Sequence, residues 1–214
     1  MKNINFYLKE VDNIFFDFDG VILDSNECKT DAFYKLYLKY GEKIANEVKI
    51  YHIRNGGISR FEKFRYWEKK YFNREIDDDA LNKLVTEFSK LVKSNVISSN
   101  EIEGSINFIE SNYKNYKMWI ISGTPTDELQ EICSKINLDG FFLGIHGSPE
   151  KKHYWSEKII SEHNLDRKKT LFIGDALADY NAAVYSKIKF LLVESKSNKN
   201  LFNKIKIQRI KNYK

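Results

Sequence analysis

The fold of this chain is decided by one stretch of sequence, Ile14-Phe15-Phe16-Asp17-Phe18-Asp19-Gly20-Val21-Ile22-Leu23-Asp24-Ser25. An apolar run typical of a buried strand ends here in two carboxylates, and Gly20 then allows a sharp turn. Asp17 and Asp19 repel each other around one point unless a cation lies between them, which suits a hard, oxygen-preferring ion such as Mg²⁺. One carboxylate then remains as a candidate nucleophile. The alternative is a solvated turn, because Asp and Gly are common turn formers.

A second apolar run ends in the same way. Thr170-Leu171-Phe172-Ile173-Gly174-Asp175 is followed, four residues after its acid, by Asp179. If a helix begins there, Asp175 and Asp179 lie one turn apart and can face the same ion. In the alternative interpretation Asp175 is only a helix N-cap, and Asp179 is an acid favoured by the dipole of the first turn.

A third apolar run, at 118–121, leads into Ser122-Gly123-Thr124-Pro125. A hydroxyl and free backbone N–H groups at a strand end can hold phosphate oxygens. The alternative is an ordinary strand-to-helix connection in which Thr124 or Thr126 caps the following helix.

These residues resemble the motifs of the haloacid dehalogenase superfamily, in the branch that includes phosphoglycolate phosphatases and β-phosphoglucomutases. DFDGVILDS at 17–25 is similar to the first motif, Ser122 takes the place of the second, and GDALAD at 174–179 matches the fourth. The third motif is a Lys after a Gly-Ser-Pro turn, here at 147–149, and the spacing to the fourth motif favours Lys152 over Lys151.

The resemblance implies a chemistry for each of these positions. Asp17 would be the nucleophile that forms an aspartyl-phosphate, and Asp19 would act as general acid and then as general base. The phosphoryl oxygens would be bound by Lys152, by Ser122 and by the backbone at Gly123. The implied ligands of Mg²⁺ are Asp17, the backbone carbonyl of Asp19, Asp175 and Asp179.

Apolar runs at about 11–17, 116–122, 141–146, 170–174 and 189–193 alternate with helical patterns. This order predicts an α/β fold, a Rossmann-like, doubly wound parallel sheet joined by right-handed crossovers. The interval 25–99 is too long for one crossover and has helical periodicity, so we expect an inserted α-helical cap there and a core formed by 1–24 and 100–214. The hinges are expected at 24–29 and 100–104, and an edge strand or short helix within 198–214.

Three cations of the expected cap are candidates for substrate binding. Asn55-Gly56-Gly57-Ile58-Ser59-Arg60 is similar to a segment of β-phosphoglucomutase-like members whose Arg contacts the substrate, and Lys63 follows one turn later. Alternatively, Ser59 caps a helix and Arg60 lies in solvent. Lys29 stands where many relatives have a His, a departure that favours a hydrolase over a mutase.

Composition narrows the class of protein further. The chain has 214 residues, a net charge of +5 and 14% aromatic residues, with 35 basic and 30 acidic side chains interleaved. No nucleic-acid partner is indicated before the C-terminal tail, and the absence of an apolar run of transmembrane length indicates no membrane partner. The segment from Met1 to Phe6 lacks the features of a signal peptide, and Cys28 and Cys133 are too few for a disulfide framework.

The simplest expectation is therefore a cytoplasmic, Mg²⁺-dependent phosphatase acting on a small phosphorylated metabolite. Two alternatives remain open, a sugar phosphomutase and a phosphate-responsive regulatory module similar to receiver domains. The long insertion and the Asp17–Asp19 pair argue against the regulatory module, because a receiver has no need of a general acid beside its nucleophile. The sequence identifies neither the substrate nor the oligomeric state.

Overall fold

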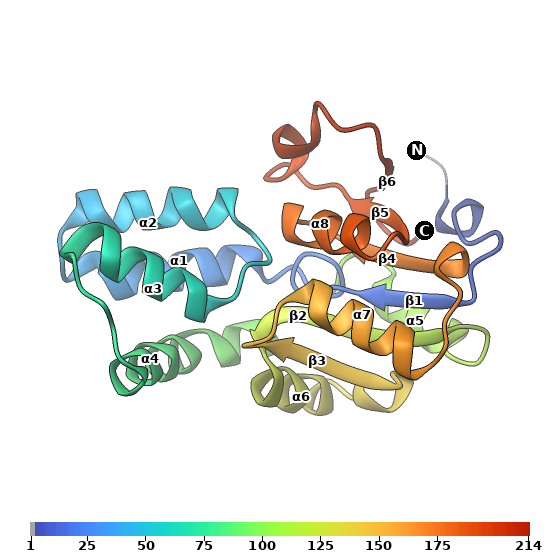
Figure 1. Ribbon diagram of the computed structural model, residues 1–214, viewed down its shortest axis with the longest axis horizontal. Coiled ribbons are helices and arrows are strands. Elements are labelled where there is room, and N and C mark those ends of the chain that lie inside the picture. Colours follow the sequence, from blue (N-terminus) through green and yellow to red (C-terminus); the bar gives the residue numbers. More distant parts are fainter. Residues whose placement is uncertain (1–2) are drawn as a thin grey trace.

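The computed structural model describes residues 3–214, so Met1 and Lys2 of the N-terminal segment lie outside the description. Its centre is a parallel sheet of six strands in the order β3-β2-β1-β4-β5-β6 (Figure 1). The strands are β1 (Asn13–Phe16), β2 (Lys117–Pro125), β3 (Gly144–Ser148), β4 (Thr170–Gly174), β5 (Lys189–Val193) and β6 (Gln208–Ile210).

Helices cover both faces of this sheet. They are α5 (Ser105–Asn112), α6 (Thr126–Lys135), α7 (Lys152–Glu162) and α8 (Leu177–Tyr185). Side chains alternate between the faces of a strand, so Phe15, Trp119 and Phe172 pack with residues of α7 and α8. Their neighbours Phe16 and Ile120 belong to the hydrophobic cluster that contains residues of α5 and α6. The predicted fold class, a doubly wound parallel α/β sheet, is confirmed.

The strand boundaries differ most from the predicted ones at two places. β2 continues through Pro125, three residues beyond its expected end, and β3 begins only at Gly144. The residues before β3 form a short 3₁₀-helix instead of extended chain. The 3₁₀-helices are η1 (Ile4–Phe6), η2 (Asp139–Phe141), η3 (Arg167–Lys169) and η4 (Lys199–Phe202). The C-terminal segment thus contains both expected elements, a short helix and an edge strand.

The direction in which the chain crosses the sheet reverses beside β1. From β1 the chain passes to β2 and β3 on one side, and then returns to β4, β5 and β6 on the other. β1 and β4 are therefore neighbours, with Phe16 opposite Ile173, and the Asp17 N–H donates to the Ile173 carbonyl at 2.9 Å. A crevice at the carboxyl ends of the strands forms where the order reverses, and the residues that follow β1 and β4 meet there.

Four helices lie between β1 and β2 in the sequence and form a separate layer beside the sheet (Figure 1). They are α1 (Asn26–Leu38), α2 (Glu42–Arg54), α3 (Arg60–Phe72) and α4 (Asp78–Ile97), and we call them the helical unit and the rest of the chain the sheet unit. An aromatic cluster joins α1, α3 and α4: the rings of Phe33 and Phe88 stack with centroids 4.0 Å apart, and Phe64 and Trp67 pack edge-on to Phe33. All four side chains are buried.

The chain enters and leaves the helical unit through two adjacent segments. The Asp24 N–H donates to the Asn100 carbonyl at 2.9 Å, and the Ile102 N–H donates to the Ile22 carbonyl at 2.9 Å. Leu23 and Glu101 form an isolated antiparallel bridge between these bonds. The expected hinges at 24–29 and 100–104 overlap with this crossing only at Asp24 and at 100–102, because α1 begins at Asn26.

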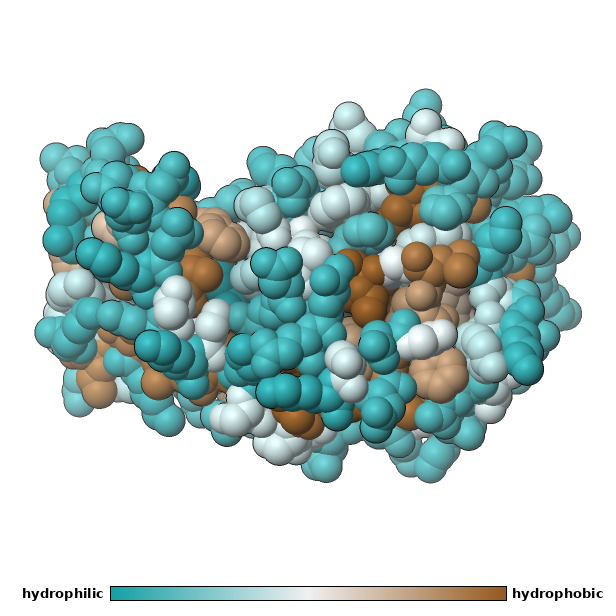
Figure 2. All heavy atoms as spheres, turned by 90° about the horizontal axis from the view of Figure 1, so that it is seen from below, coloured by the Kyte–Doolittle hydropathy of each residue, from teal (hydrophilic) through white to brown (hydrophobic). Residues whose placement is uncertain are grey.

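The face seen from below is hydrophilic over most of its area and is hollowed where the two units meet (Figure 2). Among the helices of residues 3–214, none combines the length and the apolar character that crossing a bilayer requires.

Candidate active site

Three buried carboxylates meet at the carboxyl ends of β1 and β4. Asp17 follows β1, Asp175 follows β4, and Asp179 lies in the first turn of α8. One oxygen of each lies within 4.8 Å of an oxygen of the other two. The interpretation of the first stretch as a solvated turn is wrong, because Asp17 is 2% exposed.

Asp179 is held in place by hydrogen bonds to both of its oxygens. Its Oδ2 accepts from the backbone N–H groups of Asp175 at 3.2 Å and Ala176 at 2.9 Å. Its Oδ1 accepts from Lys152 Nζ at 2.5 Å. Asp179 thus stabilises the start of α8, as the alternative interpretation expected, but the N-cap of that helix is Ala176 and not Asp175.

Lys152 is the cation of this cluster. It is the first residue of α7, and its Nζ lies 2.8 Å from Asp17 Oδ1 and 2.5 Å from Asp179 Oδ1. Burial on its own lowers the pKa of Lys152, but the charges of Asp17 and Asp179 outweigh burial and raise that pKa above its ordinary value, so the ammonium stays charged. Lys151 lies outside the site, with a largely exposed side chain 4.0 Å from Glu62.

One lysine does not balance three buried acids. Burial, followed by the charge of Asp179, raises the pKa of Asp17 to about 7. Burial, followed by the charges of Asp17 and Asp179, raises the pKa of Asp175 well above its ordinary value. Both carboxyls are therefore stabilised as anions by an added cation, and a set of buried carboxylate oxygens fits a hard ion such as Mg²⁺.

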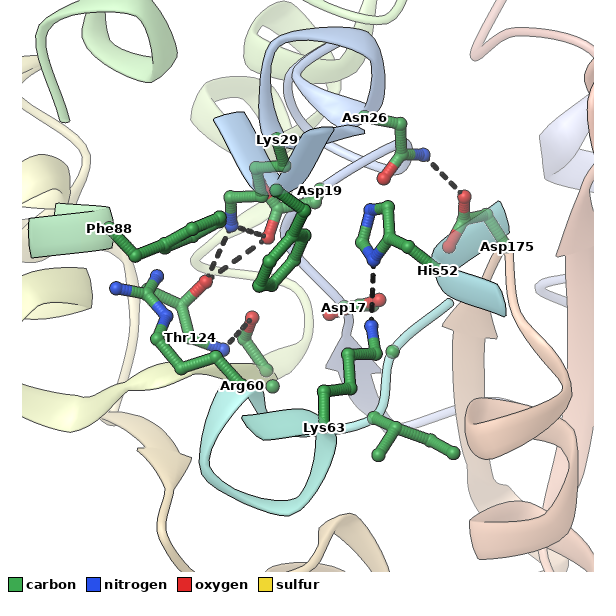
Figure 3. Close-up of a pocket in the computed structure, with 15 residues that line it drawn as sticks. Asp17, Asp19, Asn26, Lys29, His52, Arg60, Lys63, Phe88, Thr124 and Asp175 are labelled. Carbon is green, nitrogen blue, oxygen red and sulfur yellow. Dashed lines mark hydrogen bonds and ion pairs between the residues drawn. The ribbon is translucent and has the colours of Figure 1, made fainter. Parts of the chain in front are cut away.

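The backbone leaves no spare room around this cluster. Gly20 has a φ of +74°, and a Cβ at that position would lie 2.8 Å from Asp175 Cγ. Glycine is needed there both for the left-handed conformation and for the approach of the carboxylate. Asn26 fixes the same carboxylate from the start of α1, because its Nδ2 donates to Asp175 Oδ2 at 2.7 Å (Figure 3).

Asp19 has a separate environment. Its carboxylate accepts hydrogen bonds from Lys29, from Ser25 Oγ at 2.5 Å and from Thr124 Oγ1 at 3.2 Å (Figure 3). Burial on its own raises the pKa of Asp19, but the charge of Lys29 and these hydrogen bonds lower it below its ordinary value. The carboxylates of Asp17 and Asp19, two residues apart, therefore have opposite pKa shifts. Only the backbone of Asp19 remains a candidate metal ligand, because its side chain is not part of the acid cluster.

The last residues of β2 and the first residue of α6 lie on the other side of the site. Ser122 is buried, and its Oγ accepts from the Thr124 N–H at 3.2 Å. Thr124 Oγ1 accepts from Lys29 Nζ at 2.7 Å, and Thr126 Oγ1 accepts from the Gly147 N–H at 2.9 Å. Neither threonine caps α6, whose N-cap is Pro125 without a side-chain hydrogen bond. The interpretation of these residues as helix caps is wrong.

The helical unit contacts the sheet unit through the loop between α2 and α3. A Cβ on Gly123 would lie 2.6 Å from the Gly57 carbonyl oxygen, so Gly123 allows the two backbones to touch. Gly57 has a φ of +73°, and a Cβ there would lie 3.1 Å from the Cβ of Ala178 and 3.4 Å from Lys152 Nζ. This loop therefore lies directly over Gly123 and Lys152, which are expected to bind phosphoryl oxygens, and glycine is required on both sides of the contact.

Arg60 joins the two units. Its Nη1 and Nη2 donate to the two oxygens of Glu128 on α6 at 2.7 and 2.8 Å, and Nη1 also donates to Ser89 Oγ at 2.8 Å. Its guanidinium lies over the ring of Phe88, 4.6 Å from the centroid. Ser59 caps α3 as the alternative interpretation expected, but Arg60 is only 4% exposed, so the expectation that it lies in solvent is wrong.

Lys63 and His52 form a buried pair inside the helical unit. Lys63 Nζ lies 2.8 Å from His52 Nδ1, and the side chains are 2% and 8% exposed (Figure 3). Sequence reasoning did not find His52. Its position, four residues after Val48 and seven after Ala45, is on the buried face of α2, and this periodicity predicts only a core residue.

These side chains surround a small, partly open cavity between the two units. Its volume is about 40 Å³, enough for about three water molecules. The cavity is lined by Asp17, Asp19, Asn26, Lys29, Phe33, His52, Gly57, Ile58, Arg60, Lys63, Phe88, Ser122, Gly123, Thr124 and Asp175. The structure thus brings together, at one cavity, eight of the residues predicted from sequence, and it places Lys152 and Asp179 directly behind Asp17.

The fold is shared with solved structures of low sequence identity. A haloacid dehalogenase-like hydrolase family protein from Streptococcus pneumoniae is 19% identical, with a TM-score of 0.66 and 94% of each chain covered. A haloacid dehalogenase-like hydrolase from Bacteroides fragilis is 18% identical, with a TM-score of 0.72 over 94% of this chain and 96% of that one.

The CbbY protein from Rhodobacter sphaeroides, solved in complex with xylulose-1,5-bisphosphate, is 12% identical, with a TM-score of 0.72 and 95% of each chain covered. No curated protein matches the chain.

A family match adds to this likeness of fold. The sequence model of the haloacid dehalogenase-like hydrolases matches residues 14–193, which include both acid-bearing strand ends, the helical unit and Lys152. The predicted membership is confirmed: the chain belongs to the family of haloacid dehalogenase-like hydrolases.

Proposed function

We propose that this protein is a Mg²⁺-dependent phosphatase that hydrolyses a small phosphorylated metabolite through an aspartyl-phosphate on Asp17. The observation that carries the proposal is the contrast between two neighbouring carboxylates. Asp17 lies in a cluster of buried acids with Lys152, whereas Asp19 lies two residues away in a separate set of hydrogen bonds. One carboxylate is thus available as nucleophile and the other as proton carrier.

The hydrogen bonds indicate which oxygen of Asp17 attacks. Its Oδ1 accepts from the Phe18 N–H at 2.7 Å and pairs with Lys152, so Oδ2 is the oxygen left for the phosphorus. Lys152 lowers the energy of the transition state, because its ammonium lies beside the oxygens on which negative charge develops. Ser122 Oγ and the backbone N–H of Gly123 hold the other phosphoryl oxygens.

Asp17, Asp175 and the backbone carbonyl of Asp19 would hold Mg²⁺, with Asp179 keeping Asp175 and Lys152 in position. When bound, the ion neutralises phosphoryl oxygens and so lets an anionic nucleophile approach an anionic ester. Asp17 must be ionised to attack. The raised pKa of Asp17 supports the proposal that the site takes up a cation before it reacts.

Asp19 carries the protons in both steps. In its protonated form it gives a proton to the leaving oxygen as the bond to phosphorus breaks, and the carboxylate that remains then takes a proton from the water that attacks the aspartyl-phosphate. Lys29 favours the ionised carboxylate, which is the form that the second step requires. Transfer to a second substrate hydroxyl would use the same base, so the preference for a phosphatase over a mutase rests on Lys29, which stands where many relatives have a His.

We further propose that the helical unit is a cap that opens and closes over the sheet. The loop between α2 and α3 touches the backbone at Gly123 and narrows the cavity to about 40 Å³, which supports a separation of the units when a substrate enters. CbbY, which has the same fold, binds a small sugar bisphosphate. That complex supports a small phosphorylated molecule as substrate for this chain.

Turnover of p-nitrophenyl phosphate tests the proposal. The wild-type protein should release nitrophenol and phosphate repeatedly with Mg²⁺ and stop when the ion is chelated, whereas Asp17→Asn should be inactive yet folded. Asp12→Asn is the matched control, because Asp12 is an exposed acid before β1, paired with Lys169 at 3.1 Å. A single slow phosphorylation without turnover would indicate the regulatory module. Isomerisation of a sugar phosphate without free phosphate would indicate the mutase.

The proposed location is the cytoplasm. Cys28 and Cys133 are both free thiols, which suits a reducing compartment.

A further inference from the structure

Four buried cations face or adjoin the cavity, and three of them already have carboxylate partners. Lys29 is paired with Asp19, Arg60 with Glu128, and Lys152 with Asp17 and Asp179. Lys63 is different. Within residues 3–214 no ion pair joins it to a carboxylate, and its one hydrogen-bond partner is the ring of His52.

A buried ammonium without a counter-charge is costly. Burial, followed by the charges of Lys29, Arg60 and Lys152, lowers the pKa of Lys63 to about 7, and only Asp19 opposes this shift. Burial, followed by Lys63 and Lys29, also lowers the pKa of His52 well below its ordinary value, so the imidazole is neutral and its Nδ1 can accept from the ammonium. The set of groups around Lys63 thus has an excess of positive charge.

Packing alone does not account for a lysine at this position. Its Nζ lies 5.6 Å from the centroid of the Phe33 ring, in the aromatic core of the helical unit. An apolar side chain would fill the same space without the cost of burying a charge. The end of the Lys63 side chain instead lines the cavity, next to His52 and on the side formed by α2 and α3.

We propose that Lys63, oriented by His52, binds a second anionic group of the substrate, a carboxylate or a second phosphate. This inference rests on the proposed phosphatase function and deepens it, because it assigns a chemical class to the part of the substrate that does not react. It also moves the expected specificity contact from Arg60, whose guanidinium is already used by Glu128, to a residue one turn further along α3.

Three small esters separate the possible ligands of Lys63. Ethyl phosphate has only the scissile phosphate, phosphoglycolate adds a carboxylate, and ethane-1,2-diol bisphosphate adds a second phosphate. Wild-type protein should have a higher kcat/KM for at least one of the esters with two anionic groups. The preferred ester then identifies the second anion as carboxylate or phosphate.

Lys63→Met tests the contact itself. It should lower the ratio of kcat/KM for the preferred two-anion ester to that for ethyl phosphate by about 10- to 100-fold, the range expected for one charge-assisted hydrogen bond. Lys69→Met is the matched control. Lys69 lies on the same helix with an exposed side chain, 3.0 Å from Glu75, and its loss should leave the ratio unchanged. An unchanged ratio in Lys63→Met would overturn the proposal, whether both esters lost activity equally or neither did.

A binding measurement decides the question without turnover. Asp17→Asn protein is titrated with phosphoglycolate, ethane-1,2-diol bisphosphate or ethyl phosphate at pH 8, in two buffers with different heats of ionisation. A second anion that contacts Lys63 holds its ammonium protonated, and because burial lowers the pKa of the free group, the preferred two-anion ester should take up more protons than ethyl phosphate does. Equal proton uptake would contradict the proposal. Failure of the proposed phosphatase would appear separately, as no turnover of p-nitrophenyl phosphate by the wild type.

Discussion

Replacing Arg60 with methionine should weaken the closed arrangement of the two units. Arg60 and Glu128 are 4% and 8% exposed, and two hydrogen bonds of 2.7 and 2.8 Å join them across the interface. Without the guanidinium, the Glu128 carboxylate keeps only the hydrogen bond from Ser89 at 2.5 Å. Removing one partner of a buried pair costs about 3 to 5 kcal/mol, because the other charge is left uncompensated.

Separation of the units would limit the cost of the unpaired Glu128 carboxylate, because it exposes that carboxylate to water. The free energy of the closed state should then rise by about 3 kcal/mol relative to the open state, which shifts the equilibrium between them by about 100-fold. If, as proposed, the helical unit closes over every substrate, kcat/KM should fall for p-nitrophenyl phosphate as well as for esters with two anionic groups. Urea unfolding and steady-state kinetics measure the two effects.

Lys93→Met provides the matched control for this prediction. Lys93 on α4 pairs with Glu131 on α6 at 2.6 Å, across the same interface, but the side chains are 34% and 42% exposed and solvent screens the pair. If Arg60→Met and Lys93→Met behave alike in both assays, the reasoning about the buried pair is wrong. If Arg60→Met loses activity only on two-anion substrates, Arg60 is a substrate ligand, as the sequence predicted.

Two further predictions concern Asp19. Asp19→Asn should still be phosphorylated by p-nitrophenyl phosphate, because the leaving group of this substrate needs no proton. It should then accumulate a hydroxylamine-sensitive phosphoprotein, because no base activates the water. Residual turnover without this adduct would contradict the role of Asp19 as general base. Lys29→Met should raise the pKa of Asp19, because burial is then no longer outweighed by the lysine charge. Since the hydrolysis step needs ionised Asp19, the acidic limb of the kcat profile should move to higher pH, and an unmoved limb would exclude Lys29 as the group that controls Asp19.

The sheet and its acids could be predicted because each depends on a local pattern. Buried strands in a doubly wound fold have continuous apolar runs, and the runs at 170–174 and 189–193 coincide with β4 and β5. Asp17, Ser122 and Asp175 follow such runs directly. The carboxyl ends of parallel strands share one edge of the sheet, so these three residues were expected together before any tertiary contact was known.

The partners of the cations could not be predicted in the same way. Arg60 meets Glu128 across 68 positions of sequence, and Lys29 meets Thr124 across 95, through the docking of the helical unit on α6 and β2. The periodicity of a helix shows which face is buried but not which residue of another unit it meets. His52 and Lys63 lie on buried faces of α2 and α3, where a pattern of apolar residues does not distinguish a binding group from a core residue.

The pairing of Leu23 with Glu101 determines which part of this chain can vary in evolution. Backbone hydrogen bonds already hold the two ends of the insertion side by side, so the strands on either side stay connected whatever the length of chain between them. The entropy of closing such a loop grows only with the logarithm of its length. A lineage, or an engineer, can therefore lengthen, shorten or exchange the helices while the reaction centre on the sheet stays intact, and a new substrate preference needs no new chemistry.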